Sequence, residues 1–111
     1  MNNTMTIKGY TAVISFDPDT AQFRGEFTGI NGGAEFYGAS VVALRKEGAR
    51  SLQTFLEVCK EHDIEPHKNF SGKFVVRVPA PLHARVSEAA AAAGVSLNQW
   101  VQSALEREVH A

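Results

Sequence analysis

Polar and apolar residues alternate over residues 73–78. One side of the alternation is apolar and consists of Phe74, Val76 and Val78, and the other consists of Lys73, Val75 and Arg77. A period of two is typical of a strand with one buried face. Pro79 cannot donate a ladder hydrogen bond and closes the pattern. We therefore predict a strand over residues 73–78 whose apolar face needs a cover.

Two amphipathic helices are predicted after this strand. The first has apolar residues at helical spacing, namely Leu82, Val86, Ala89 and Ala93, and Gly94 can end it in the left-handed conformation. The second begins at Ser96, with Gln99 three residues later as a capping-box partner. Its apolar stripe consists of Leu97, Trp100, Val101, Ala104 and Leu105.

One strand and two helices, in about forty residues, are close to the lower limit for an independent core. A second copy of the segment would supply the missing strand by antiparallel pairing across a two-fold axis. We therefore predict a homodimer, with higher oligomers left open. Its expected core consists of Phe74, Val76, Val78, Leu82, Val86, Trp100, Val101 and Leu105.

The order strand, Arg-x-Pro, helix, Gly-x-Ser-x-Asn, helix resembles the ribbon-helix-helix DNA-binding family. The resemblance implies that outward strand residues read bases in the major groove of operator DNA and that the start of the second helix holds a phosphate. The implied base readers are Lys73, Val75 and Arg77, and the implied phosphate contacts are Gly94, Ser96 and Asn98. Lys and Arg can donate to guanine, whereas Val75 can contact only a thymine methyl group. The alternative is a dimerisation module with a solvated strand.

The first forty residues predict an antiparallel meander of three strands, over residues 10–16, 23–28 and 35–37, with turns at 17–20 and 31–33. A helix from an N-cap at Ser40 to about His62 is expected to cover it. Its apolar stripe consists of Val41, Leu44, Gly48, Leu52, Phe55 and Cys59. Gly48 in a helix interior indicates close approach to the sheet. The predicted fold class is α+β, with domains at 1–63 and 72–111 and a linker at 64–71.

The whole order of elements resembles the HicB antitoxin family. The matching residues are Gly29-Ile30, Gly38 with Ser40, residues 70–74, Arg77 with Pro79, Leu82-His83 and residues 96–101. The resemblance implies a degenerate ribonuclease-H-like domain that neutralises a HicA-type mRNA-cleaving toxin, and a second domain that represses the shared operon. Arg24, Glu26, Glu35 and Tyr37, on the predicted strands, are candidate toxin contacts. An orphan or ligand-responsive repressor without a toxin stays open.

The charge of the chain and the types of its side chains reduce the number of functions to consider. The net charge of −1 argues against a protein that coats nucleic acid non-specifically. Ribonuclease-H-type catalysis needs converging carboxylates, and Asp17, Asp19, Glu26 and Glu35 are not expected to converge, so we expect no enzyme. Cys59, His62 and His67 do not match a compact metal motif, and His83 is interpreted as surface or packing, so no cofactor or metal is expected. One cysteine and no apolar run of membrane-spanning length favour a reduced, cytoplasmic protein.

Overall fold

The computed structural model describes residues 3–110 and divides the chain into two compact units. One unit ends at Ser71 and the other begins at Gly72. We refer to them as the sheet unit and the helical unit, and each is described by itself. No helix within residues 3–110 combines the length and the apolar character that crossing a membrane requires.

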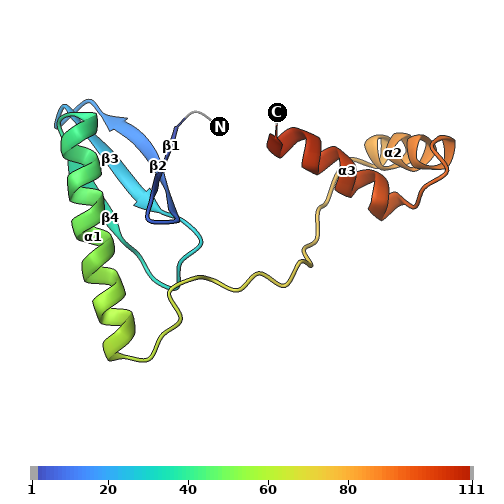
Figure 1. Ribbon diagram of the computed structural model, residues 1–111. Coiled ribbons are helices and arrows are strands. Elements are labelled where there is room, and N and C mark those ends of the chain that lie inside the picture. Colours follow the sequence, from blue (N-terminus) through green and yellow to red (C-terminus); the bar gives the residue numbers. More distant parts are fainter. Residues whose placement is uncertain (1–2, 111) are drawn as a thin grey trace. The chain divides into compact units, whose positions relative to one another are not determined.

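The sheet unit contains one antiparallel sheet in the order β1-β2-β3-β4 (Figure 1). Its strands are β1 (Thr4–Ile7), β2 (Tyr10–Asp17), β3 (Gln22–Phe27) and β4 (Glu35–Gly38). The prediction of three strands was therefore wrong by one strand, β1. Met5 and Ile7 are buried while Thr4 and Thr6 are exposed, so β1 has the period-two pattern over only four residues.

The turn before β2 explains how so short a strand is held. Lys8 and Gly9 both have positive φ angles, of 49° and 83°. Two consecutive residues of this kind make the tight hairpin turn whose twist suits antiparallel strands. The turn sets the register in which Met5 lies opposite Ala12. Burial of Met5 and Ile7 then supplies the stability that four residues alone lack.

Helix α1 (Val41–Glu61) packs on one face of the sheet (Figure 1). Its predicted N-cap is confirmed, because the Ala43 N–H donates to Ser40 Oγ at 3.1 Å. Leu44 and Leu52 are 1% exposed and anchor the core. Val41 was expected to be buried but is 61% exposed, because the apolar stripe passes the edge of the core in the first turn.

Gly48 allows α1 to approach the sheet closely, as predicted. A Cβ atom at this position would lie 2.5 Å from Ile7 Cδ1 and 2.8 Å from Phe36 Cε2. On the sheet, the same Phe36 ring lies against the backbone of Gly25, its partner on the neighbouring strand β3. The ring is thus held between two glycines, one on the sheet and one on the helix.

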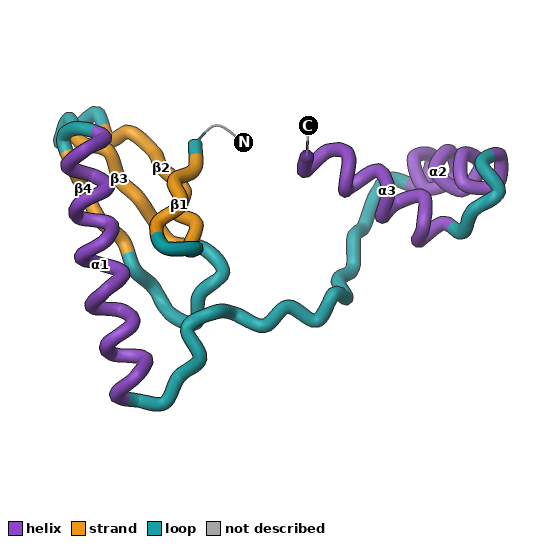
Figure 2. The backbone as a smooth tube through the Cα atoms, in the orientation of Figure 1, coloured by secondary structure: helices purple, strands orange, loops and turns teal. Residues whose placement is uncertain are grey.

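Residues 64–68, which we call the strap, run back from the end of α1 to the loop that follows β3 (Figure 2). Ile30 and His67 form an antiparallel bridge, and the Lys68 N–H donates to Gly29 O at 2.8 Å. Asn31 Nδ2 donates to Glu65 O at 2.7 Å and to His67 O at 3.1 Å. The predicted linker therefore needs correction in its first half, which is bound to the sheet unit.

The helical unit contains α2 (Ala80–Ala92) and α3 (Leu97–His110), which pack against each other. The residues from Gly72 to Pro79 form neither helix nor strand (Figure 2). The ribbon-helix-helix layout is thus present only as its two helices, and the strand predicted over 73–78 is not formed in the single chain. A strand requires a partner, and among residues 3–110 the sheet contains only β1 to β4.

Candidate functional site

The segment predicted to pair between copies is apolar and exposed. Phe74 is 72% exposed, Val76 64% and Val78 45%. Val75, the apolar residue at an implied base-reading position, is 88% exposed. Lys73 and Arg77 are also exposed. Four large apolar side chains left in water within five residues indicate a surface that a single chain does not complete.

The helices of the same unit continue this apolar surface. Leu82 on α2 and Leu105 on α3 are 44% and 46% exposed, while Val86, Trp100 and Val101 are half-buried. Ala90, at 3%, is the buried hydrophobic residue that this unit contributes among the described residues. An alanine cannot form a core for about forty residues, because burying so small a side chain contributes little hydrophobic free energy.

The predicted phosphate contacts lie at the junction of α2 and α3, with Gly94 and Ser96 between the helices and Asn98 in the first turn of α3. Gly94 has a φ angle of 70°, which ends α2. Ser96 Oγ accepts from the Gln99 N–H at 3.1 Å, and the Ser96 N–H donates to Gln99 Oε1 at 3.4 Å. The predicted capping box is confirmed. Ser96 is therefore occupied by its helix, and Asn98 remains as an exposed polar side chain in the first turn.

The four candidate toxin contacts lie together on the exposed face of β3 and β4. Arg24 lies opposite Tyr37, and Glu26 lies opposite Glu35. Arg24 Nε donates to Glu35 Oε2 at 3.1 Å, and Arg24 Nη1 donates to Glu26 Oε2 at 3.1 Å. The hydrogen bonds that Arg24 makes to Glu35, and then to Tyr37 and Glu26, raise the pKa of Arg24 above its ordinary value. Arg24 thus bridges two carboxylates that would otherwise repel each other across the strands.

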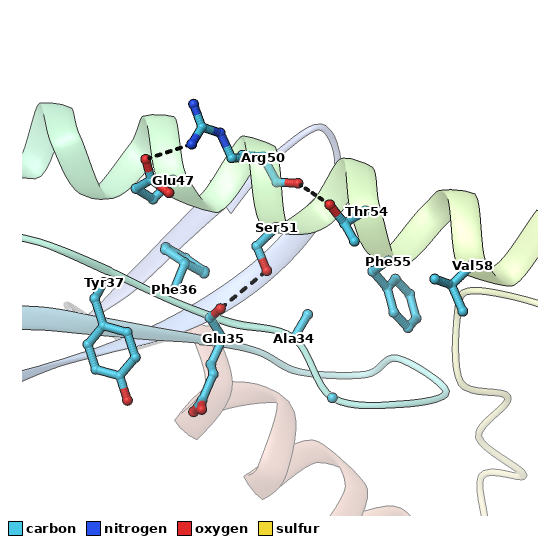
Figure 3. A pocket seen from close by; sticks show the side chains of 11 residues that line it. Ala34, Glu35, Phe36, Tyr37, Glu47, Arg50, Ser51, Thr54, Phe55 and Val58 are labelled. Carbon is cyan, nitrogen blue, oxygen red and sulfur yellow. Dashed lines mark hydrogen bonds and ion pairs between the residues drawn. The ribbon is translucent and has the colours of Figure 1, made fainter.

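A groove of about 700 Å³ runs between β4 and α1 (Figure 3). Glu35 and Tyr37 contribute one side, and Glu47, Arg50 and Thr54 of α1 contribute the other. Figure 3 shows Ser51 reaching across to β4, where its hydroxyl donates to Glu35 O at 3.3 Å. The sequence indicated the helix but gave no signal for this contact between helix and strand edge.

Some of the residues considered for catalysis or metal binding make structural contacts. Asp17 Oδ1 accepts from the Asp19 N–H at 3.0 Å, which stabilises the turn after β2. Cys59 is buried in the sheet unit, and His67 stacks on Tyr10 with ring centroids 4.3 Å apart. Within residues 3–110, no three His, Cys, Asp or Glu side chains are grouped so that they could hold a metal ion.

A sequence model of the HicB family matches residues 55–105. The match begins in α1, continues through the strap and residues 72–79, and ends in α3. The match covers less than half of the chain and shows that this region is similar to the HicB family. Comparison with curated proteins and comparison with solved structures each gave no match.

Proposed function

We propose that this protein is the antitoxin of a HicA/HicB-type pair. In this proposal the helical unit dimerises and binds operator DNA, so that the protein represses its own operon. The sheet unit binds a small mRNA-cleaving toxin and neutralises it. The observation that carries the proposal is the exposed apolar surface of residues 73–78 together with α2 and α3, within the region matched by the HicB family.

Dimerisation follows from this surface. Antiparallel pairing of residues 73–78 with a second copy would turn a segment without strand partners into a two-stranded ribbon. The ribbon would place Phe74, Val76 and Val78 against four helices, two from each copy. Burial of these side chains is worth roughly 1.5–3 kcal/mol each, which favours association strongly over two exposed copies.

DNA binding follows from the groups that the dimer would leave outward. Lys73 and Arg77 from each copy would face the major groove, where either can donate to guanine. The first intrahelical bond of α3 joins the Trp100 N–H to Ser96 O at 3.0 Å. The N–H groups of Leu97 and Asn98 precede it and point out of the helix N-terminus, where a phosphate is favoured. Asn98 adds a side-chain donor at the same place.

Toxin neutralisation is assigned to the sheet unit because of its separate core and its charge. An RNA-cleaving toxin needs a basic surface to hold its substrate. Residues 1–71 contain seven basic and nine acidic residues, and complementary charge would accelerate encounter between the two proteins. Glu26 and Glu35, whose carboxylates are exposed, are two of these nine acidic residues.

The test separates the two activities. The full chain and a chain that ends at Ser71 are each expressed with the toxin of the adjacent reading frame, and operator binding is measured by gel shift. The shorter chain keeps the strap and is expected to rescue growth without shifting operator DNA. A folded shorter chain that does not bind the toxin would refute the assignment of neutralisation to the sheet unit.

An orphan repressor is the second candidate, because the match to the HicB family lies mainly on the helical unit and omits the sheet. It predicts the same dimer and the same operator binding. It differs in having no toxin gene beside its own and no protein that the sheet unit neutralises.

A further inference from the structure

The outer edge of β4 carries backbone groups that no neighbouring strand uses. β4 is the last strand of the sheet, and its residues Glu35 and Tyr37 lie opposite Glu26 and Arg24. The Phe27 N–H donates to Ala34 O at 3.0 Å, so Phe27 and Ala34 form a hydrogen-bonded pair. The backbone groups of Ala34 therefore point toward β3. Since hydrogen-bonded and non-hydrogen-bonded pairs alternate in an antiparallel ladder, the N–H and C=O groups of Glu35 and Tyr37 point away from β3.

Helix α1 covers part of each sheet edge. Ser51 donates to Glu35 O on β4, and Arg45 Nη1 donates to Thr6 O on β1 at 3.1 Å. Such side-chain contacts reduce the tendency of an exposed edge strand to pair unspecifically with a strand of another molecule. Among the described residues, the hydrogen bonds assign no partner to the outward N–H and C=O of Tyr37. The open part of the β4 edge is therefore centred on Tyr37.

The groove beside this edge has room for a further chain. Its volume of about 700 Å³ extends along β4, and α1 forms its second wall. Phe55, which is half-buried, and Val58, which is 45% exposed, give it an apolar end beyond Ser51 (Figure 3). The charged residues around it are Glu35 and Glu47, together with Arg50, whose Nη1 lies 3.7 Å from Glu47 Oε1. An incoming segment would meet both an apolar and an acidic contact.

We propose that β4 binds an extended, basic segment of the toxin, which adds a fifth strand to the sheet by pairing with Tyr37. This inference rests on the proposed function and specifies where the toxin binds. In strand addition, backbone hydrogen bonds supply affinity and alternate side chains supply selectivity. Side chains on the α1 side of the added strand contact Phe55 and Val58. Lysine or arginine side chains on the other side lie beside Glu35 and Glu26, whose Arg24 partner neutralises only one of the two charges.

The test uses a proline at the edge. Tyr37→Pro in the full chain removes the outward N–H, and leaves the bonds between β3 and β4 in place because Tyr37 makes none of them. Tyr37→Phe is the matched control, since it keeps the backbone donor and the ring. Binding to a catalytically inactive form of the toxin from the adjacent reading frame is measured by calorimetry. Circular dichroism and hydrogen exchange at the Leu44 and Leu52 amides verify that the sheet unit of both variants is folded.

We expect Tyr37→Pro to weaken toxin binding by about tenfold or more. Tyr37→Phe, which keeps the outward N–H and loses only the hydroxyl, should weaken toxin binding much less. Hydrogen exchange on the wild-type complex needs no substitution, and the Tyr37 amide is expected to become protected when the toxin binds. Equal binding by Tyr37→Pro, or an amide that exchanges equally fast in the complex, would overturn the strand addition while leaving the antitoxin function standing. Wild-type protein that binds no toxin would instead overturn the proposed function itself. Protection of the Tyr37 amide that rises with protein concentration in the absence of toxin would assign this edge to a second copy and would also overturn the inference.

Discussion

Replacement of Gly48 by alanine tests whether close approach of α1 to the sheet is needed for stability. The added Cβ would lie 2.5 Å from Ile7 Cδ1 and 2.8 Å from Phe36 Cε2. Ile7 Cδ1 is the end of a flexible side chain and can rotate. The Phe36 ring cannot withdraw, because Gly25 is already in contact with its opposite side.

Two effects of opposite sign determine the result. In the interior of a helix, alanine is favoured over glycine by about 1 kcal/mol. Forcing an extra carbon into a packed core costs about 1–3 kcal/mol. Since Phe36 is 4% exposed and held on both sides, we expect the packing cost to exceed the helix gain. The free energy of unfolding should therefore fall by about 1 kcal/mol.

Urea unfolding followed by helical circular dichroism measures this change, with hydrogen exchange at the Leu44 and Leu52 amides reporting on the sheet unit. The control is Gly48→Ala combined with Phe36→Leu, which removes the ring. In that background, alanine should be neutral or stabilising, with a coupling of about 1 kcal/mol between the two positions. If Gly48→Ala alone raises the unfolding free energy, the argument from close packing is wrong.

Three further predictions concern assembly, DNA and the strap. Val76→Asp should cost several kcal/mol by placing an unpaired charge in the ribbon, and light scattering should then find a monomer where the wild type is a dimer; a monomeric wild type at micromolar concentration would refute this. Arg77→Ala should cost roughly 1–3 kcal/mol in operator binding and relax base preference, whereas Asn98→Ala should weaken all DNA sequences equally; unchanged gel-shift titrations would contradict both roles. Asn31→Asp should accelerate exchange of the Lys68 amide more than Asn31→Ala does, because alanine only removes the two donors, whereas a carboxylate is also repelled by Glu65 O and His67 O; equal exchange in all three proteins would refute the strap's dependence on this side chain.

Local signals predicted the helices well. The caps at Ser40 and Ser96 and the positive φ at Gly94 follow from side chains and backbone within a few residues of the helix end. The apolar spacing of α1 likewise identified Leu44 and Leu52 as core residues. Each of these features depends on contacts that are near in sequence.

Features that depend on distant contacts were not predicted from the sequence. β1 has only four residues, and its identity as a strand depends on pairing with β2. The strap was interpreted as a linker because Pro66 and charged residues are typical of one, and nothing near Asn31 indicates that its amide binds residues 65 and 67. Of the candidate site residues, Arg24, Glu26, Glu35 and Tyr37 were predicted to be exposed on strands, but their joint network depends on a register that the sequence did not specify.

The strap determines how far apart the two units of one chain can move. If the connection began after His62, its ten Cα–Cα steps to Gly72 would reach about 35 Å when fully extended. Because Lys68 is bound to Gly29, four steps remain, and the reach falls to about 14 Å. The volume that one unit can explore around the other scales with the cube of this distance, so it shrinks about fifteen-fold. Under the proposed function, a toxin held on the sheet unit would accordingly be kept at a high effective concentration near the operator, and the contacts of the strap with Gly29, Ile30 and Asn31 would set that concentration.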